Sequence, residues 1–565
     1  MDHRSVRVGN SVPRKNGKKV PRENAKKVHR NRRSIRQQNF PWLQVAIGVV
    51  VVLGVTLRVG TIGSVDVRSP DERNFTRQAK MVQEEGVGGV RTLVQEFRDD
   101  TSRFMSASPT RAGYLWILAG AMSVTGLEDE RAGAYLSCAA SVLSLLMLCW
   151  IGWRFFNPTI GVLGALFYAF SPIELAVSRR CWQEAPAELL ILLIVFLACE
   201  ITRGSRRSAH FVLLGLLGAV SVTIKESSAL GFMLCLAWVL LVLAQGREWR
   251  AFAIAVGSGV LGVVAGVLWI SYNLGSVQTL IEFSEVAARF YQTNQYSIVY
   301  EGGSPYLLIE ALWTLSPVIL LASGVGIVLL VRGRSWWPLG ESAWKSAVGM
   351  SIIVLIFVSL SVFLPHKQNP RYIASAFGMW YLLGALGLWY AITSIRIIAP
   401  RTERRTFGTI LGLLLLLAAL SDYRAYQVRI LGTGIQDLTV RMLLSPTGRI
   451  SPAEANIVDV YYAETRATAH PSAERYVSLS LAYFEGHKYN ECITAARNAV
   501  KLDPNCAPAY NNMSAAYQSL SDWDNAVETA QKSVQLDSTF SLAKRNLAFS
   551  IARQNQARSQ AGILH

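Results

Sequence analysis

Residues 70–81 read PDERNFTRQAKM and follow directly on the first strongly apolar segment, Pro41 to about Gly63. Two adjacent carboxylates, Asp71 and Glu72, therefore stand at the end of a segment long enough to cross a membrane. An isolated Asp-Glu pair is usually part of a solvated loop, since charged side chains mostly lie in water. Ionisable side chains near lipid are costly, however, and tend to be functional. The pair is a candidate site whose importance depends on the rest of the chain.

The composition of the chain is that of a membrane protein. Of its 565 residues, 51% are hydrophobic, and the formal net charge is +18. The mean hydropathy is +0.28. Soluble domains do not combine these values, because such a chain has more apolar surface than one core can bury. We therefore expect an all-α fold, with a polytopic bundle of membrane helices as its main domain, residues 41–421.

The positive charge is concentrated in residues 1–40. This segment holds thirteen Lys or Arg residues and two acidic residues, and so carries eleven of the eighteen net positive charges. We interpret it as a disordered cytoplasmic tail that orients the chain by the positive-inside rule. Contact with anionic lipid is the alternative. We expect no nucleic-acid partner.

Eleven segments are apolar enough to be membrane spans, and the loops between them indicate an orientation. If the amino terminus is inside, every inner loop carries Arg or Lys, as the positive-inside rule requires. The carboxyl terminus is then outside. Residues 113–126 are apolar but too few to cross a bilayer, so we expect an interfacial helix within the first outer loop, 64–131. The expected spans are 41–63, 132–150, 158–177, 186–201, 211–224, 228–244, 251–271, 305–331, 346–364, 372–395 and 406–421.

The loops expected on the outer side carry charges that topology disfavours. Such charges need another explanation, for instance the binding of a charged substrate. Four charged groups stand out in these loops. In chain order they are Pro70-Asp71-Glu72 with Phe75, Arg179 with Glu184-Ala185-Pro186, a glycine-containing span from Gly215 that ends at Lys225, and Arg371-Tyr372.

This order of groups resembles the C-type membrane glycosyltransferases, which use polyprenyl-phosphate sugars. That family includes protein O-mannosyltransferases and lipid A aminoarabinose transferases, and the resemblance covers roughly residues 41–395. The chain differs from the family pattern in two places. Glu184 stands where Asp is common, and Arg111 follows a single Pro109 where relatives often have a basic residue and paired prolines. No role is therefore carried over to the loop around Pro109.

The resemblance implies inverting transfer of a sugar from a lipid phosphate to an acceptor hydroxyl. A carboxylate must take the proton of that hydroxyl, and Asp71 is the expected base, with Glu72 orienting it or binding a hydroxyl. The released phosphate monoester has a second pKa of about 6 and needs no general acid. It does need cations where water is scarce. The residues expected to hold it are Lys225, Arg371, Arg179, His366 and Lys367.

Glu184 has two expected roles and one simpler alternative. It would bind sugar hydroxyls, or hold a divalent cation together with Asp71. This cation is the one cofactor considered. The simpler role is an ion pair with Arg179 or Arg180, because neighbouring opposite charges usually pair. The phosphate-binding residues have simpler roles too, as interfacial anchors or solvated side chains.

A second pattern begins near Ser472, where the hydropathy falls. Aromatic and apolar positions recur every 34 residues, which predicts tetratricopeptide repeats at 473–506 and 507–540, followed by a capping helix to about 556 and a tail, 557–565. Two repeats alone are marginal, so we expect support from the linker 422–471 or the membrane domain. The repeats, 472–556, would bind a protein partner or acceptor, or be purely structural. The recurring positions include Leu479, Met513 and Leu547, Tyr476 and Tyr510, and Tyr483 and Tyr517.

The expected protein is a multi-pass glycosyltransferase of a prokaryotic inner or plasma membrane, with active site and repeats facing outward. Its partners are a polyprenyl-phosphate sugar donor, membrane lipid, and a protein, lipid or glycan acceptor. The alternative from another class is a transporter or flippase of an amphipathic substrate. That class predicts charges at mid-span and an internal repeat, and neither is evident. A third interpretation is an inactive membrane anchor that presents the repeats.

Overall fold

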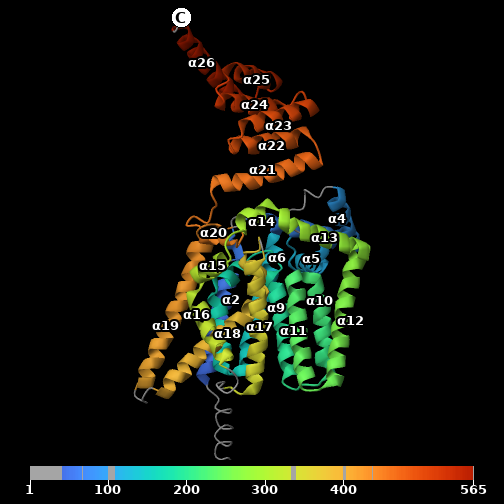
Figure 1. Cartoon of the computed structure of the whole chain (residues 1–565), viewed down its shortest axis with the longest axis vertical. Helices are drawn as coiled ribbons and strands as arrows, with labels where there is room; N and C mark the ends of the chain where they lie inside the picture. Colours follow the sequence, from blue (N-terminus) through green and yellow to red (C-terminus); the bar gives the residue numbers. More distant parts are fainter. Residues whose placement is uncertain are drawn as a thin grey trace, which may run out of the picture. The chain divides into compact units, whose positions relative to one another are not determined.

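Figure 1 shows the chain as a computed structural model, in which residues 41–60, 62–65, 68–99, 109–332, 339–364, 366–398, 403–435 and 437–563 are described. The chain divides into two units, Met1–Gly48 and Val49–His565. The expected basic tail, residues 1–40, lies outside the described residues. Within the described ranges every regular element is a helix, which confirms the all-α prediction.

Apolar helices make up most of residues 41–425. In the described part of the chain, six are long and apolar enough to cross a membrane, which indicates an integral multi-pass membrane protein. Three more, within α2, α7 and α10, are apolar but shorter. The total of eleven spans and their orientation stay predictions. The helices are α2 (Pro41–Val59), α6 (Glu130–Ile151), α7 (Pro158–Phe170), α8 (Pro172–Val177), α9 (Glu184–Thr202), α10 (Ser208–Ile224), α11 (Glu226–Gln245), α12 (Trp249–Leu274), α15 (Leu307–Leu315), α16 (Pro317–Val331), α17 (Glu341–Phe363), α18 (Pro370–Ile398) and α19 (Glu403–Ala425).

Two segments expected as single spans are broken helices in the structure, and their crossing of the membrane stays a prediction. The segment 305–331 consists of α15 and α16, which are bent by 113° at Ser316. Ser316 has φ −153° and ψ 77°, because a proline at 317 disfavours the helical conformation of the residue before it and donates no backbone hydrogen bond. The segment 158–177 is divided in the same way at Ser171, before Pro172, into α7 and α8.

Glycines allow the closest contacts between the membrane helices. In Figure 1, α10, α11 and α12 run side by side, and α10 packs against α12. A Cβ atom on Gly262 of α12 would lie 2.1 Å from the carbonyl oxygen of Gly215 in α10. A Cβ atom on Gly387 of α18 would likewise lie 2.0 Å from the carbonyl oxygen of Ala322 in α16. Since lipid tails provide no hydrophobic force between helices, such close van der Waals packing stabilises the bundle.

Shorter helices lie in the segments of chain that connect the membrane helices. They are α3 (Pro70–Glu85), α4 (Val87–Asp99), α5 (Ala112–Thr125), α13 (Val277–Thr293) and α14 (Gln295–Tyr300). The expected interfacial segment, 113–126, corresponds to α5, which packs against α3, α6 and α10. Its residues Tyr114, Leu115 and Leu118 are buried. Protein therefore covers one face of α5, and its position relative to a membrane stays a prediction.

The chain after α19 folds into further helices, and from α21 onwards each packs against the next (Figure 1). Helix α21 packs against both α14 and α22. The starts of α22, α24 and α26 are 34 residues apart, the same spacing as the sequence pattern, although the assignment to the tetratricopeptide class stays a prediction. The helices are α20 (Val440–Leu444), α21 (Pro452–Ala469), α22 (Ala473–Glu485), α23 (Tyr489–Leu502), α24 (Ala507–Ser519), α25 (Trp523–Leu536) and α26 (Ser541–Ile563).

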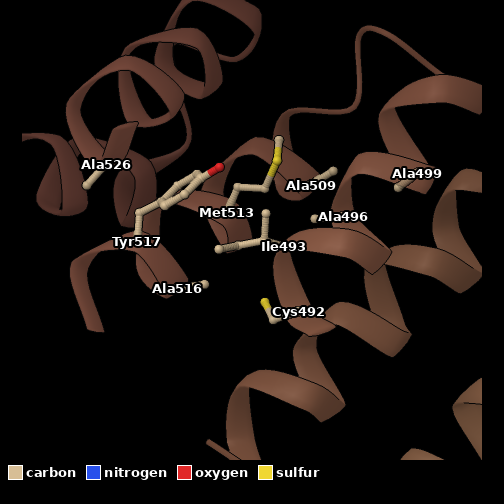
Figure 2. Packing of buried hydrophobic residues seen from close by; sticks show 9 residues of the cluster. All are labelled: Cys492, Ile493, Ala496, Ala499, Ala509, Met513, Ala516, Tyr517 and Ala526. Carbon is tan, nitrogen blue, oxygen red and sulfur yellow. The ribbon is translucent and has the colours of Figure 1, made fainter. Parts of the chain in front are cut away.

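The core of these helices is made largely of small residues. Figure 2 shows Ile493 of α23 and Met513 of α24 within a cluster whose other members are mostly alanines. Alanines at the contact let neighbouring helices approach closely, which explains why small residues recur along the repeat. The cluster consists of Cys492, Ile493, Ala496, Ala499, Ala509, Met513, Ala516, Tyr517 and Ala526.

Candidate functional site

Asp71 lies in the first turn of α3, at a strongly specified helix start. Ser69 is the N-cap: its hydroxyl accepts a hydrogen bond from the backbone N–H of Glu72, and the Glu72 carboxylate accepts one from the backbone N–H of Ser69 at 2.8 Å. Pro70 occupies the first helical position, where its missing N–H costs nothing. This capping box fixes the direction of the Asp71 side chain, which is 25% exposed.

Glu72 is buried and ties α3 to the segment 178–183. Its carboxylate forms ion pairs with Arg180 at 2.8 Å and Arg68 at 3.0 Å, and it accepts a hydrogen bond from the backbone N–H of Cys181 at 2.9 Å. Burial raises the pKa of Glu72, but Arg180 and the backbone donors outweigh it and lower the pKa overall. Because these contacts use both carboxylate oxygens, they favour a structural role over the expected catalytic one.

A polar cavity of about 220 Å³ lies beside Asp71. The expected outer segments meet here, although they are far apart in sequence. Asp71, Glu184, Lys225 and Arg371 all line it, so four of the predicted site residues share one cavity. The full lining is Ser69, Pro70, Asp71, Arg111, Gln183, Glu184, Lys225, Asn294, Tyr296, Ser297, Tyr300, Glu301, Arg371, Tyr372, Asp437, Met442 and Tyr462.

Arg371 stands at the centre of a cluster of carboxylates. Its guanidinium lies 2.9 Å from Asp437, 3.2 Å from Glu184 and 3.7 Å from Asp71. The ring of Trp182 covers one face of it, with its centroid 3.9 Å from Cζ. We expected Arg371 to hold a phosphate. Its partners in the structure are these carboxylates and Trp182, and its phosphate-binding role stays a prediction.

Glu184 is engaged through one of its two oxygens by cations from two other segments. One of its oxygens accepts hydrogen bonds from Lys225 at 2.8 Å and from Arg371 at 3.2 Å. The simpler expectation, an ion pair with Arg179 or Arg180, is therefore not what the structure contains. The described residues contain no group of three or more His, Cys, Asp or Glu side chains arranged for a metal, and the divalent cation between Asp71 and Glu184 stays a prediction.

A second cavity, of about 640 Å³, is mainly apolar and adjoins the first. Its apolar lining includes Leu230, Phe357 and Leu364. Arg111, Lys225 and Tyr372 line both cavities, so cationic side chains stand at their junction. The complete lining is Thr110, Arg111, Val222, Lys225, Glu226, Ser227, Ala229, Leu230, Met233, Ile270, Leu280, Ser284, Ala287, Phe357, Leu360, Ser361, Leu364, Lys367, Tyr372 and Ile373.

The three cations of the apolar cavity differ in their surroundings. Burial lowers the pKa of Lys367 to about 8, although Glu301 opposes the shift, and its ammonium lies 4.9 Å from the ring centroid of Tyr372. Burial also lowers the pKa of Lys225, an effect that Glu184 partly offsets. Arg111 is paired with Glu226 at 2.9 Å. These positive charges are thus held in a poorly solvated place, where an anion gains most from them.

Several residues of the polar cavity were not predicted. Glu301 accepts hydrogen bonds from Asn369 at 3.0 Å and Tyr372 at 2.9 Å, and its pKa is raised to about 7, first by burial and then by Asp437. Asp437 comes from the segment expected to be a linker. Burial raises the pKa of Asp437, but the charge of Arg371 outweighs this and lowers it overall. The one sequence signal that could have identified Glu301 was its position, as the acidic residue at the end of the expected outer loop 272–304.

Two predicted phosphate-binding residues lie elsewhere. Arg179 and His366 line neither cavity. Arg179 is buried with its guanidinium 5.3 Å from the ring centroid of Tyr426, and burial lowers its pKa to about 10. His366 occupies a turn with φ 56°. The expectation that these two hold a phosphate is not supported by their positions. Lys367, the neighbour of His366, does line the apolar cavity.

Comparison with known protein families gives a match in the middle of the membrane region. Residues 112–272 match the family described as dolichyl-phosphate-mannose-protein mannosyltransferase. The matched segment contains Glu184 and Lys225, two residues of the polar cavity. No curated protein sequence gives a significant match.

Several solved structures align with most of the chain at low sequence identity. ArnT from Cupriavidus metallidurans in the apo state aligns with a TM-score of 0.43 and 12% identity, over 87% of this chain and 79% of that protein. The same protein bound to undecaprenyl phosphate aligns with a TM-score of 0.46 and 11% identity, over 87% of this chain and 80% of that protein. The third structure is an oligosaccharyltransferase from Archaeoglobus fulgidus, tethered with an acceptor peptide. It aligns with a TM-score of 0.44 and 12% identity, over 80% of this chain and 59% of that protein.

Proposed function

We propose that the protein is a membrane glycosyltransferase that moves a sugar from a polyprenyl-phosphate donor to an acceptor hydroxyl. The observation that carries this proposal is the meeting of an apolar and a polar cavity at Arg111, Lys225 and Tyr372. An amphipathic donor requires this arrangement: apolar walls for its chain, polar walls for its sugar, and cations for the phosphate between them. The family match of residues 112–272 supports the same class of reaction.

The character of the two cavities supports one position for the donor. Its polyprenyl chain lies in the apolar cavity, and its phosphate lies beside Arg111, Lys225 and Lys367, which all line that cavity. The sugar then extends into the polar cavity, where Asp71 is found. This order brings the anomeric carbon between the phosphate and Asp71, which is the geometry that a displacement with inversion needs.

The chemical step is a single displacement. The acceptor oxygen attacks the anomeric carbon from the face opposite the phosphate, while Asp71 accepts the proton of the acceptor hydroxyl. The bond between the anomeric carbon and the phosphate oxygen breaks, and the lipid phosphate leaves with the electron pair. Cations at the cavity junction stabilise the charge that develops on it, so that no general acid is required.

The helical repeats are proposed to recruit a protein acceptor or an assembly partner. Support comes from α21, which packs against α22 and places Tyr462 in the wall of the polar cavity. The Tyr462 hydroxyl donates a hydrogen bond to Asn294 at 2.9 Å. A partner held by the repeats would thus be tethered beside the cavity, at an effective concentration of about the millimolar range. The basic loops of the expected topology place both regions on the outer side of the membrane.

Binding of the donor phosphate provides the test. Arg111→Ala should weaken the binding of a short-chain polyprenyl phosphate to the purified protein by about tenfold or more, since a charged hydrogen bond contributes about 1.5–3 kcal/mol. Arg77→Ala is the matched control, because Arg77 also forms an ion pair, with Glu96 at 2.8 Å, but lines neither cavity. If Arg111→Ala and the wild type bind the polyprenyl phosphate with equal affinity, the phosphate does not lie at this junction. Translocation of the labelled lipid without sugar transfer would favour a flippase.

A further inference from the structure

Helix α14 forms one wall of the polar cavity, although it is only six residues long. Tyr296, Ser297 and Tyr300 of this helix line the cavity. Helices shorter than about 12–15 residues are marginally stable by themselves, because few hydrogen bonds offset the cost of nucleation. The position of α14, and with it the shape of this wall, therefore depends on the contacts at its two ends.

The carboxyl-terminal end of α14 is held by the chain that leads into α18. Glu301, its C-cap, is buried, and the carboxylate accepts hydrogen bonds from Asn369 at 3.0 Å and from Tyr372 at 2.9 Å. The backbone carbonyl of Glu301 accepts a further hydrogen bond from the N–H of Gln368 at 3.1 Å. These donors all lie within residues 368–372, so this end of α14 is fixed to the membrane domain itself.

The amino-terminal end of α14 is held by α21. Asn294, its N-cap, is 3% exposed, and the side-chain oxygen accepts hydrogen bonds from the backbone N–H of Tyr296 and from the Tyr462 hydroxyl, each at 2.9 Å. Burial raises the pKa of Tyr462, so the phenol keeps the proton that it donates here. Tyr462 lies 168 residues beyond Asn294 in the chain, and the contact between α14 and α21 brings the two together.

The hydroxyl of Tyr296 connects α14 to the charged cluster of the polar cavity. It donates a hydrogen bond to one oxygen of Asp437 at 3.2 Å, and the other oxygen of Asp437 accepts one from Arg371 at 2.9 Å. All three side chains line the polar cavity. A displacement of α14 would therefore move both the aromatic wall of this cavity and the charged groups that face it.

We propose that Tyr462 is a positioning residue for sugar transfer, because its hydrogen bond to Asn294 holds α14 in the wall of the polar cavity. The inference rests on the proposed function, in which the sugar of the donor occupies this cavity. A loosened wall leaves the anomeric carbon less well oriented, which slows the displacement. The lipid phosphate lies at the junction with the apolar cavity, so its binding does not depend on this hydrogen bond.

Tyr462→Phe tests the inference, since it removes the hydroxyl and keeps the ring. In the full-length enzyme, kcat for transfer from a polyprenyl-phosphate sugar should fall about three- to tenfold, the value of one neutral hydrogen bond. The Kd of a short-chain polyprenyl phosphate, which has no sugar, should stay at the wild-type value. Tyr461→Phe is the matched control, because Tyr461 is the neighbouring residue of α21 and lines neither cavity.

Hydrogen–deuterium exchange of the backbone amides reports on α14 without any need for activity. Exchange in residues 295–301 should be faster in Tyr462→Phe than in the wild type and in Tyr461→Phe. Asn294→Ser perturbs the same contact from the other side. Serine is also a good N-cap, but its shorter side chain ends farther from the Tyr462 hydroxyl. It should reproduce both effects, and it carries the test if Tyr462→Phe does not fold.

A double-mutant cycle shows whether Tyr462 acts through α14. Tyr296→Phe removes the hydrogen bond between α14 and Asp437. In the variant that combines it with Tyr462→Phe, the fall in kcat should be smaller than the product of the two single effects, because both substitutions act through one element. A fall equal to that product would mean that Tyr462 acts by another route, and would overturn the inference.

The remaining outcomes separate the inference from the function on which it rests. Unchanged kcat or unchanged exchange of α14 in Tyr462→Phe would overturn the inference and leave the glycosyltransferase proposal intact. A lower melting temperature with a parallel loss of polyprenyl-phosphate binding would overturn it too, since the role would then be generally structural. Absence of sugar transfer by the wild type would instead refute the proposed function, and the exchange measurement would still decide whether Tyr462 holds α14.

Discussion

Raising the pH should weaken the binding of a polyprenyl phosphate, and Lys367→Arg should suppress most of that loss. Lys367 lines the apolar cavity, and burial lowers its pKa to about 8, so its ammonium is charged below that pH and neutral above it. An ordinary lysine has a pKa of about 10.4 and would stay charged throughout this range. A cation stabilises the bound phosphate, and therefore affinity is expected below about pH 8 and is lost as the pH rises through it.

The magnitude follows from the titration and from the value of one charged hydrogen bond. One unit above its pKa, about a tenth of the side chain remains protonated, so affinity should fall about tenfold per pH unit. The fall ends when the whole contribution, about 1.5–3 kcal/mol, is lost, which corresponds to about 10- to 150-fold in Kd. The lipid phosphate has its own second pKa at about 6 and stays dianionic over this interval.

Calorimetric titration of the purified protein with a short-chain polyprenyl phosphate, between about pH 7 and 9.5, measures this effect. Arginine keeps its charge over the whole interval, so Lys367→Arg should give a nearly flat profile. Two other groups titrate in or near this interval: Lys225, whose pKa is also lowered by burial, and Glu301, whose pKa is raised to about 7. A decline in Lys367→Arg as steep as in the wild type would refute the assignment to Lys367 and transfer it to one of these two groups.

Four further predictions concern the base, the helix cap, the bundle and the repeats. Asp71→Asn should lower sugar transfer about 10²- to 10⁴-fold with an unchanged Kd for the donor, and retained activity would place the base elsewhere. Glu72→Gln should mainly lower the melting temperature, because it removes the charge paired with Arg180 at 2.8 Å; lost transfer at an unchanged melting temperature would restore a catalytic role. Gly262→Leu should reduce the yield of folded, monodisperse protein, whereas Gly257→Leu, where a Cβ meets no atom within 4 Å, should not, and equal yields would show that the α10–α12 contact is adaptable. Removing residues 472–565 should raise the KM for the acceptor and leave the donor Kd unchanged; an unaltered KM would exclude recruitment by the repeats.

Local signals in the sequence were enough to find residues at the ends of apolar helices. Asp71, Glu184, Lys225 and Arg371 were selected as charges next to apolar spans, and all four line one cavity. Their roles stay predictions. Such charges are recognisable because lipid disfavours them, whatever the tertiary structure is. The period of 34 residues is a local signal of the same kind, and the helix starts repeat with it.

The partners of these residues could not be predicted from local sequence. Asp437 lies in the segment expected to be a linker, where an aspartate is unremarkable, and only the fold brings it to Arg371. The carboxylate partners of Arg371 come from distant segments, so long-range packing determines them. Arg111 was set aside because its loop departs from the family pattern, yet it lines both cavities. The helix breaks at Ser171 and Ser316 were predictable from the prolines that follow them, but hydropathy alone does not register such breaks.

The contact of α21 with the polar cavity has a consequence for the modular use of the repeats. Tyr462 of α21 forms part of the cavity wall, and Asp437 precedes that helix by a short stretch of chain. The natural place to exchange one repeat array for another is therefore not where the membrane helices end but after Ala469, the last residue of α21. A chimera joined earlier would receive a foreign wall in the polar cavity, whereas one joined after Ala469 would exchange the later helices and leave that wall unchanged.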